Sequence, residues 1–183
     1  MKFLDIDPEV LERNLLALGG KRIYDRIFRD RVFDFPDWRL QAKTSWVRLR
    51  DKGDRVTLSF KDASKTGGAN NFGMEEIEVV VSDFDKTSEL FKRIGLIEKF
   101  NEEKNRVHFE LDGIDIDIDT WPLIPPYVEI EGKNWGEVRK MADRLGLDWE
   151  KRETTGAMGI YRKYGIEEKD YEVLMFERQV KRK

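Results

Sequence analysis

Three segments of the chain carry apolar residues at the three- and four-residue spacing of an amphipathic helix. Each segment follows an Asp or Asn that can cap a helix N-terminus and stops at a glycine that can end the helix. The segments run from Asp7 to Gly19, from Asp83 to Gly95 and from Asn134 to Gly146. The pattern predicts three helices whose apolar stripes face a core.

Between these helices apolar and polar residues alternate, and a period of two is typical of strands with one buried face. Short connections such as Asp51-Lys52-Gly53-Asp54 and Asp112-Gly113 favour antiparallel hairpins over crossover units. The chain is therefore predicted to be an α+β protein. The alternating segments are 47–50, 56–61, 76–81, 106–111, 114–119 and 127–131, and residues 23–35 are strand-like with a less regular pattern.

A polar stretch from Asp62 to Gly73 contains Gly67-Gly68 and Asn70-Asn71 and predicts a flexible loop. Because strands resume directly after it, we interpret it as a loop within a domain rather than a linker. The length of 183 residues is enough for one core, so a single domain over residues 1–183 is the expectation.

The composition excludes several kinds of site. The chain has no cysteine, which excludes disulfides, a thiol nucleophile and zinc sites built on thiolates. Its single histidine, His108, excludes metal clusters of several histidines. No uncharged run exceeds nine residues, and Met1 to Asp5 contains no apolar signal core, whereas a membrane span needs roughly 20 apolar residues. A cytoplasmic protein is therefore the expectation.

Charged residues make up 39% of the chain, but 34 basic and 37 acidic residues nearly cancel to a net charge of −3. This near neutrality argues against a general nucleic-acid or membrane-surface binder, which normally has a basic excess. The charges collect on the polar faces of the predicted strands with one sign at positions i and i+2, as in Arg48-x-Arg50 and Glu129-x-Glu131. Like charges side by side cost stability unless a counter-ion or ligand compensates them.

Two interpretations of these charged faces follow. They form an ordinary solvated face of an antiparallel sheet, or they line the inside of a sheet that closes into a barrel. In a closed sheet, paired carboxylates would offer the oxygen ligands that Mg²⁺ or Mn²⁺ prefers, and arginines and lysines would match phosphate oxygens. The second interpretation predicts a site for a triphosphate and a divalent cation.

The ordered set of charged pairs resembles the CYTH domains, or triphosphate tunnel metalloenzymes, which include class IV adenylyl cyclases, thiamine triphosphatases and inorganic triphosphatases. The resemblance extends from near the start of the chain to about Tyr161. It implies a closed eight-stranded antiparallel β-barrel, the tunnel, with helices packed on the outside. The matching residues are Arg48-x-Arg50, Thr57 to Lys61, Glu76-x-Glu78, Lys104-x-Arg106, Asp119 and Glu129-x-Glu131.

The resemblance also implies a role for each charged position. Lys2 is similar to the last residue of the family's N-terminal Glu-x-Glu-x-Lys signature, whose two glutamates are absent here. Weak metal binding is therefore expected of a chain that starts at Met1. The implied triphosphate-binding residues are Lys2, Arg48, Arg50, Lys61, Lys104 and Arg106, the implied metal ligands are Glu129 and Glu131, and the implied catalytic or orienting residues are Glu76, Glu78 and Asp119.

The resulting hypothesis is a divalent-metal-dependent enzyme, a monomer or homodimer. It would hydrolyse a nucleoside, thiamine or inorganic triphosphate or cyclise ATP to cyclic AMP. The alternatives are a non-catalytic nucleotide- or polyphosphate-binding module and a plain α+β interaction domain. His108 shares the face of Arg106 and is either a proton carrier or a bystander. Tyr161 is a candidate for the role of a tyrosine that relatives carry near this position.

Overall fold

The computed structural model describes residues 1–64 and 74–182, so residues 65–73 of the predicted polar loop lie outside the described residues. The helices are α1 (Pro8–Ala17), α2 (Phe84–Arg93), α3 (Trp135–Arg144) and α4 (Ala157–Lys163). The strands are β1 (Lys2–Phe3), β2 (Lys21–Asp34), β3 (Ser45–Asp51), β4 (Val56–Asp62), β5 (Glu75–Val81), β6 (Ile97–Leu111), β7 (Ile114–Thr120), β8 (Tyr127–Glu131), β9 (Tyr171–Leu174) and β10 (Gln179–Lys181).

Helices α1, α2 and α3 confirm the three predicted helices. Helix α4 is absent from the prediction because seven residues are too few to show a helical period. In the three predicted helices the capping side chain accepts a hydrogen bond from a backbone N–H three residues on, in the pairs Asp7–Val10, Asp83–Lys86 and Asn134–Glu137.

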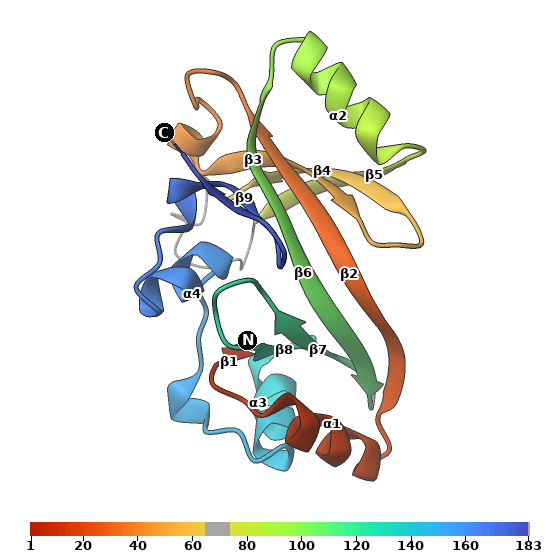
Figure 1. The fold of residues 1–183 in the computed structure, drawn as a ribbon. Helices are drawn as coiled ribbons and strands as arrows, with labels where there is room; N and C mark the ends of the chain where they lie inside the picture. Colours follow the sequence, from red (N-terminus) through yellow and green to blue (C-terminus); the bar gives the residue numbers. More distant parts are fainter. Residues whose placement is uncertain (65–73, 183) are drawn as a thin grey trace. The chain divides into compact units, whose positions relative to one another are not determined.

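The strands form one hydrogen-bonded sheet in the order β1-β8-β7-β6-β2-β3-β4-β5, in which β9 pairs with β6 and β10 with β9. Figure 1 shows the long strands β2 and β6 side by side. The predicted hairpins β3–β4 and β6–β7 are antiparallel, whereas β9 pairs with β6 in parallel. Asp112 and Gly113 between β6 and β7 both have positive φ angles, 53° and 75°, as a tight two-residue hairpin turn requires.

The α+β class with an antiparallel sheet is confirmed, but the prediction of a closed eight-stranded barrel is wrong. In residues 1–64 and 74–182 the sheet has ten strands and is open, and β1 and β5 are the two ends of the strand order. Strand β1 has only two residues, and its other edge is occupied by Glu153, which exchanges two backbone hydrogen bonds of 2.9 and 2.8 Å with Lys2. Because β1 is short and already paired on both sides, it offers no edge on which the sheet could close.

The chain divides into two compact units. The first unit comprises residues 1–26 and 104–154, and the second comprises residues 27–103 and 155–183. Strands β2 and β6 contribute residues to both. The expectation of a single folded domain stays a prediction. None of the helices in the described ranges combines the length and hydrophobicity needed to cross a membrane.

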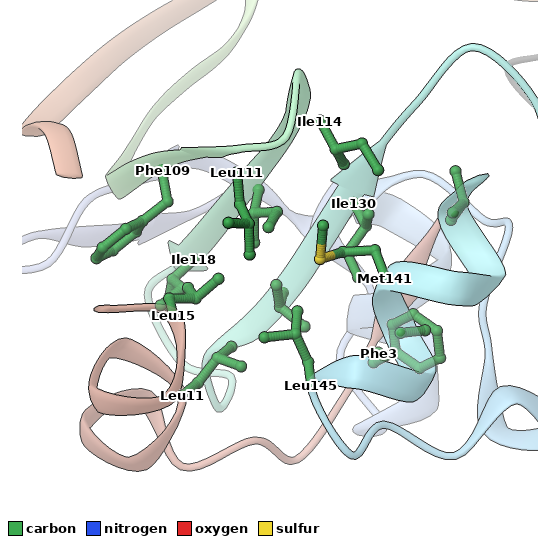
Figure 2. Packing of buried hydrophobic residues seen from close by; sticks show 14 of the residues in the cluster. Phe3, Leu11, Leu15, Phe109, Leu111, Ile114, Ile118, Ile130, Met141 and Leu145 are labelled. Atoms are coloured by element: carbon green, nitrogen blue, oxygen red, sulfur yellow. The ribbon is translucent and has the colours of Figure 1, made fainter. Parts of the chain in front are cut away.

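The core of the first unit lies between α1, α3 and the apolar face of β6, β7 and β8. Figure 2 shows Leu11 and Leu15 of α1, Met141 of α3 and its C-cap residue Leu145 together with Ile130 of β8 in one cluster. Leu15 and Ile130 are fully buried. The apolar half of the alternating pattern is therefore used for packing, which leaves the charged half on the opposite face.

The core of the second unit lies between α2 and the apolar face of β2 and β3. Phe33 and Leu49 are fully buried with Phe84 of α2, and Phe91 packs edge-on against Phe33 at a ring-centroid distance of 5.1 Å. Strand β5 is covered less, and Ile77 remains 68% exposed. As in the first unit, the charged residues occupy the sheet face opposite the helix.

Candidate functional site

In the first unit, charged residues of neighbouring strands lie opposite one another on the face away from the core. We name this set the first-unit charged face. Side chains that are directly opposite in an antiparallel pair project to the same side, so the register decides which charges meet. It pairs Arg106 with Asp119, His108 with Asp117 and Lys2 with Glu129. The face consists of Lys2, Lys104, Arg106, His108, Asp115, Asp117, Asp119, Glu129 and Glu131.

Asp119 is the centre of this face and is fully buried. Its Oδ1 accepts a hydrogen bond of 2.7 Å from Nε of Arg106, and its Oδ2 accepts 2.7 Å bonds from Nη2 of Arg106 and Nζ of Lys104. Burial by itself would raise the pKa of Asp119, but these two cations hold that pKa well below its usual range. Asp119 thus orients Lys104 and Arg106, and its catalytic role stays a prediction.

Arg106 contacts three carboxylates. Besides the two bonds to Asp119, its Nη1 lies 2.5 Å from Asp117 and its Nη2 lies 3.3 Å from Glu129. Burial opposes the charged form of Arg106, yet the three carboxylates raise its pKa well above the ordinary value. The guanidinium group is therefore fully compensated within the first unit.

Glu129 and Glu131 are the predicted metal ligands, and they lie on one face of β8 because they are two residues apart. Lys2 Nζ is 2.6 Å from Glu129, and burial together with the neighbouring Glu129 and Asp117 carboxylates raises the pKa of Glu131. Among residues 1–64 and 74–182, no three Asp, Glu or His side chains are grouped so that they could hold a metal ion. Two carboxylates fit a Mg²⁺ ion whose other ligands are substrate phosphates and water, rather than an all-protein cage.

His108 is held by β7 and β2. Its Nδ1 forms a 2.7 Å hydrogen bond with Asp117, and its ring stacks on Tyr24 at a centroid distance of 4.9 Å and an interplanar angle of 19°. Arg26 lies over the same tyrosine ring at 4.9 Å. Burial raises the pKa of Asp117 despite the adjacent Arg106 charge and the hydrogen bond with His108. His108 is therefore fixed in position, and its role as a proton carrier stays a prediction.

In the second unit, β2, β3, β4 and β5 present a different arrangement, which we name the second-unit charged face. The register places Ser59 opposite Arg48 and Thr57 opposite Arg50, so β4 offers these arginines hydroxyl groups instead of carboxylates. The negative charges come from the two flanking strands, β2, which pairs with β3, and β5, which pairs with β4. The face consists of Asp30, Arg48, Arg50, Thr57, Ser59, Lys61, Glu76 and Glu78.

Arg50 is committed to a buried partner. Its Nε donates a 2.6 Å hydrogen bond to Oδ1 of Asp30, and its Nη2 donates a second bond to Oδ2 of the same carboxylate. The Arg50 guanidinium group also lies over the ring of Phe28 at 5.4 Å. This bidentate pair fixes the orientation of Arg50.

The lysines of this region pair with the carboxylates of β5. Lys61 Nζ is 2.8 Å from Glu76, and Lys52 Nζ in the β3–β4 connection is 3.6 Å from Glu78. Burial by itself would raise the pKa of Glu76, but Lys61, Arg48 and the Ser59 hydroxyl lower it. Glu76 and Glu78 are thus placed beside cations, and their catalytic or orienting role stays a prediction.

Arg48 is the cation with the weakest compensation on this face. Its side chain is 18% exposed, and its Nη2 lies 3.9 Å from Oε1 of Glu76. Its Nε is buried and has no hydrogen-bond partner among the described residues. Burial, followed by the adjacent Arg50 charge, lowers the pKa of Arg48 to about 10, so the group remains charged at neutral pH. A buried donor without a partner is costly, and an acceptor from a ligand would satisfy it.

The structure adds Asp30 and Asp117 to the residues that the sequence-based site contains, and it places Thr57, which matches the family pattern without an implied role, beside Arg50. Asp117 is two residues from Asp119 and lies on the same face of β7, so alternation alone could have included it. Asp30 lies in the segment with the least regular alternation, so its face could not be assigned before the register was known. Tyr161, in contrast, is fully buried in α4.

Comparisons with known proteins identify the family of the chain. The CYTH domain model matches residues 1–171. Several solved structures are similar: a conserved hypothetical protein from Pyrococcus furiosus has 23% identity and a TM-score of 0.69, with 87% of this chain and 96% of that chain covered. A candidate adenylate cyclase from Vibrio parahaemolyticus has 12% identity and a TM-score of 0.73, with 88% and 95% covered.

A candidate adenylyl cyclase from Hippeastrum, described as having a dominant triphosphatase activity, has 14% identity and a TM-score of 0.65, with 90% of this chain and 94% of that chain covered. A search of the curated proteins gave no match. The structural similarities, all at low identity, show the fold, and the family model covers nearly the whole chain. The chain therefore belongs to the CYTH domain family.

Proposed function

We propose that this CYTH protein binds a triphosphate and catalyses reaction at its phosphoanhydride with the help of Mg²⁺ or Mn²⁺. The reaction is either hydrolysis or the cyclisation of ATP to cyclic AMP. The family membership supports an enzyme of this kind, and the named activities of the Vibrio and Hippeastrum proteins come from the same fold.

The observation that carries the proposal is the state of Arg48. A half-buried guanidinium with an unpartnered Nε, next to Arg50 and Lys61, is a cationic hydrogen-bond donor that the nearby carboxylates leave incompletely bonded. Guanidinium and ammonium groups bind phosphate oxygens strongly because the hydrogen bonds are charge-assisted. A polyanionic ligand would therefore supply the hydrogen-bond acceptor that Arg48 Nε lacks among the described residues.

The remaining residues divide between positioning and chemistry. Asp30 holds Arg50 in a fixed orientation, and Asp119 does the same for Lys104 and Arg106. In hydrolysis, a carboxylate such as Glu76 or Glu78 would orient the attacking water, whose oxygen bonds to phosphorus as the bridging oxygen leaves. In cyclisation, the ribose 3′-hydroxyl would attack the α-phosphate and pyrophosphate would leave.

Glu129 and Glu131 would hold the divalent cation. When bound, a Mg²⁺ or Mn²⁺ ion neutralises phosphate charge and makes the phosphorus more electrophilic. The ion pairs of Glu129 with Lys2 and Arg106 must then be exchanged for contacts with the cation.

The test is a calorimetric titration with inorganic triphosphate, ATP and thiamine triphosphate, each with and without Mg²⁺ or Mn²⁺, followed by product analysis. We expect binding of at least one triphosphate and a loss of about 100-fold in affinity in Arg48→Met, since removal of a buried charge-assisted contact costs about 3 kcal/mol. Arg55→Met, which removes an exposed arginine of the same hairpin, is the control. Absence of binding by the wild type, or equal affinity of Arg48→Met, contradicts the proposal.

A second candidate function is triphosphate binding without turnover. It is favoured by the pairing of Glu129 with Lys2 and Arg106, because these cations satisfy the carboxylate without a metal. Product analysis separates the two functions: release of phosphate, or of cyclic AMP with pyrophosphate, supports the enzyme, and unchanged ligand after prolonged incubation supports the binding module.

A further inference from the structure

Thr57 lies in the middle of β4 on the second-unit charged face and is 1% exposed. Its hydroxyl group is buried and has no hydrogen-bond partner among the described residues. Removing a hydroxyl from water without a compensating hydrogen bond costs free energy, so buried hydroxyls in folded proteins are nearly always bonded. The orphaned Thr57 hydroxyl therefore indicates a missing partner at this position.

The neighbours of Thr57 limit what that partner can be. Thr57 is directly opposite Arg50 and diagonal to Arg48, whose Nε is another buried group without a hydrogen-bond partner among the described residues. Diagonal neighbours in an antiparallel pair are about 7–8 Å apart, a span that a ligand with several oxygens can bridge. An arginine N–H can only donate, so the ligand atom that meets Nε must be an acceptor.

A cation does not meet these conditions, since Arg50 lies directly opposite Thr57, Arg48 lies diagonal to it, and Lys61 lies on the same face of β4. An anionic tetrahedral group meets them, because its several oxygens accept hydrogen bonds in different directions and its charge is attracted to the three cations. A hydroxyl donates to such an oxygen as readily as an amide does.

We propose that the Thr57 hydroxyl binds a non-bridging phosphate oxygen of the ligand, next to the oxygen that is bound by Arg48. This inference rests on the proposed function, and it adds an uncharged residue to the phosphate-binding set. Thr57 is then a binding residue whose hydroxyl is unsatisfied until the ligand arrives.

A ligand-binding hydroxyl and a structural hydroxyl differ in how their removal changes the melting temperature and the ligand affinity. The isosteric substitution Thr57→Val removes a group that has no partner in the ligand-free protein, so the ligand-free protein keeps or increases its melting temperature. The same substitution removes one hydrogen bond to a charged ligand, which lowers the affinity about 10- to 100-fold. Stability and affinity are thus expected to change independently or in opposite directions.

The experiment measures the melting temperature without ligand and the Kd for inorganic triphosphate by calorimetry, in wild type, Thr57→Val and Thr57→Ser. Thr57→Ser keeps the hydroxyl and is expected to bind within about threefold of wild type, since a retained hydrogen bond retains most of its free energy. The control is Thr87→Val, because the Thr87 hydroxyl donates a 2.6 Å bond to the carbonyl of Asp83 in α2. It is expected to melt at a lower temperature with an unchanged Kd.

Two outcomes overturn the inference alone: wild-type affinity in Thr57→Val, which means that water satisfies the hydroxyl, or a lower melting temperature of the ligand-free variant, which means that the hydroxyl has a protein partner. A wild type that binds no triphosphate overturns the proposed function and the inference together. Weak binding by Thr57→Val that is restored in Thr57→Ser, at an unchanged or higher melting temperature, supports the inference.

Discussion

The two charged faces of this protein contain the same kinds of side chain but differ in how completely their arginines are paired with carboxylates. On the first-unit charged face, Arg106 contacts three carboxylates and Asp119 accepts bonds with both oxygens. On the second-unit charged face, Arg48 approaches its nearest carboxylate only to 3.9 Å and leaves its Nε without a partner. The charge of Arg106 is therefore compensated by protein carboxylates, whereas Arg48 still has a donor that an anion could bind.

The difference arises from the strand next to each cation pair. Strand β7 offers an aspartate at every second position, so the β6–β7 register brings Asp119 opposite Arg106. Strand β4 offers Thr57 and Ser59 at the equivalent positions beside Arg50 and Arg48. Identical spacing of like charges therefore produces a cation with close carboxylate partners in one place, Arg106, and a cation without a close carboxylate partner in the other, Arg48.

Asp119→Asn is expected to lower the free energy of unfolding by about 3–5 kcal/mol, because it removes the buried charge that compensates Lys104 and Arg106. The substitution keeps the side-chain volume, so the loss reports charge and hydrogen bonding. Urea unfolding at pH 7 measures it. The control is Asp112→Asn, whose exposed pair with Arg144 is worth less than about 1 kcal/mol. A loss as small as that of the control would show that the first-unit network is not compensating.

Arg50→Met and Arg48→Met are expected to differ in stability although the two arginines are neighbours. Arg50→Met leaves the buried Asp30 carboxylate without its bidentate partner and lowers the free energy of unfolding by about 3 kcal/mol. Arg48→Met removes a charge without a close partner and changes it by less than about 1 kcal/mol. Urea unfolding of both variants decides the matter, and equal losses would refute the assignment of Arg48 as uncompensated.

Inorganic triphosphate is expected to stabilise the wild-type protein by about 2.7 kcal/mol at a concentration 100 times its Kd. The stabilisation should be much smaller in Arg48→Met at the same ligand concentration and unchanged in Arg55→Met. Urea unfolding with and without ligand provides the measurement. If triphosphate stabilises both arginine variants equally, the anion binds elsewhere.

The partly exposed pair of Asp51 and Arg29 supplies the smallest expected effect. Burial alone would raise the pKa of Asp51, but the Arg29 guanidinium 2.6 Å away and the Gly53 N–H lower it. A folded-state pKa below the unfolded value of about 3.9 means that the pair stabilises the protein above that pH and loses its effect as the pH falls through the folded pKa.

Asp51→Asn should therefore cost less than about 1 kcal/mol at pH 7, since much of this pair is screened by solvent, and less still at pH 3. Urea unfolding of wild type and variant at the two pH values gives the difference. A cost that increases at pH 3 would reverse the expected sign.

Much of the local structure could be predicted from the sequence because it depends on nearby residues. The caps at Asp7, Asp83 and Asn134 bond within one turn, and the Asp112-Gly113 turn needs only its own backbone angles. Strands β9 and β10 could not be predicted, since they have only four and three residues and β9 joins the sheet through β6, which lies far earlier in the chain.

The candidate site was predictable in part. Alternation assigned Arg48, Arg50, Arg106 and Asp119 to polar faces, and the structure places them there. Alternation could not indicate that Arg50 is bound by Asp30 while Arg48 is not, because the two have the same parity and the same residue type. It also could not indicate that Glu153 pairs with β1, which is why the closed barrel was a wrong prediction.

By itself, then, the sequence determined which segments are helices and which are strands, and where the first three helices end. It also determined on which face of its strand each charged residue lies. All of these depend on neighbours a few positions away. Only the tertiary structure decided which charges compensate one another, which edges of the sheet are paired and which buried donors lack a partner. These depend on the register between strands that are distant in sequence, and strand register is set by the packing of whole faces rather than by any local pattern.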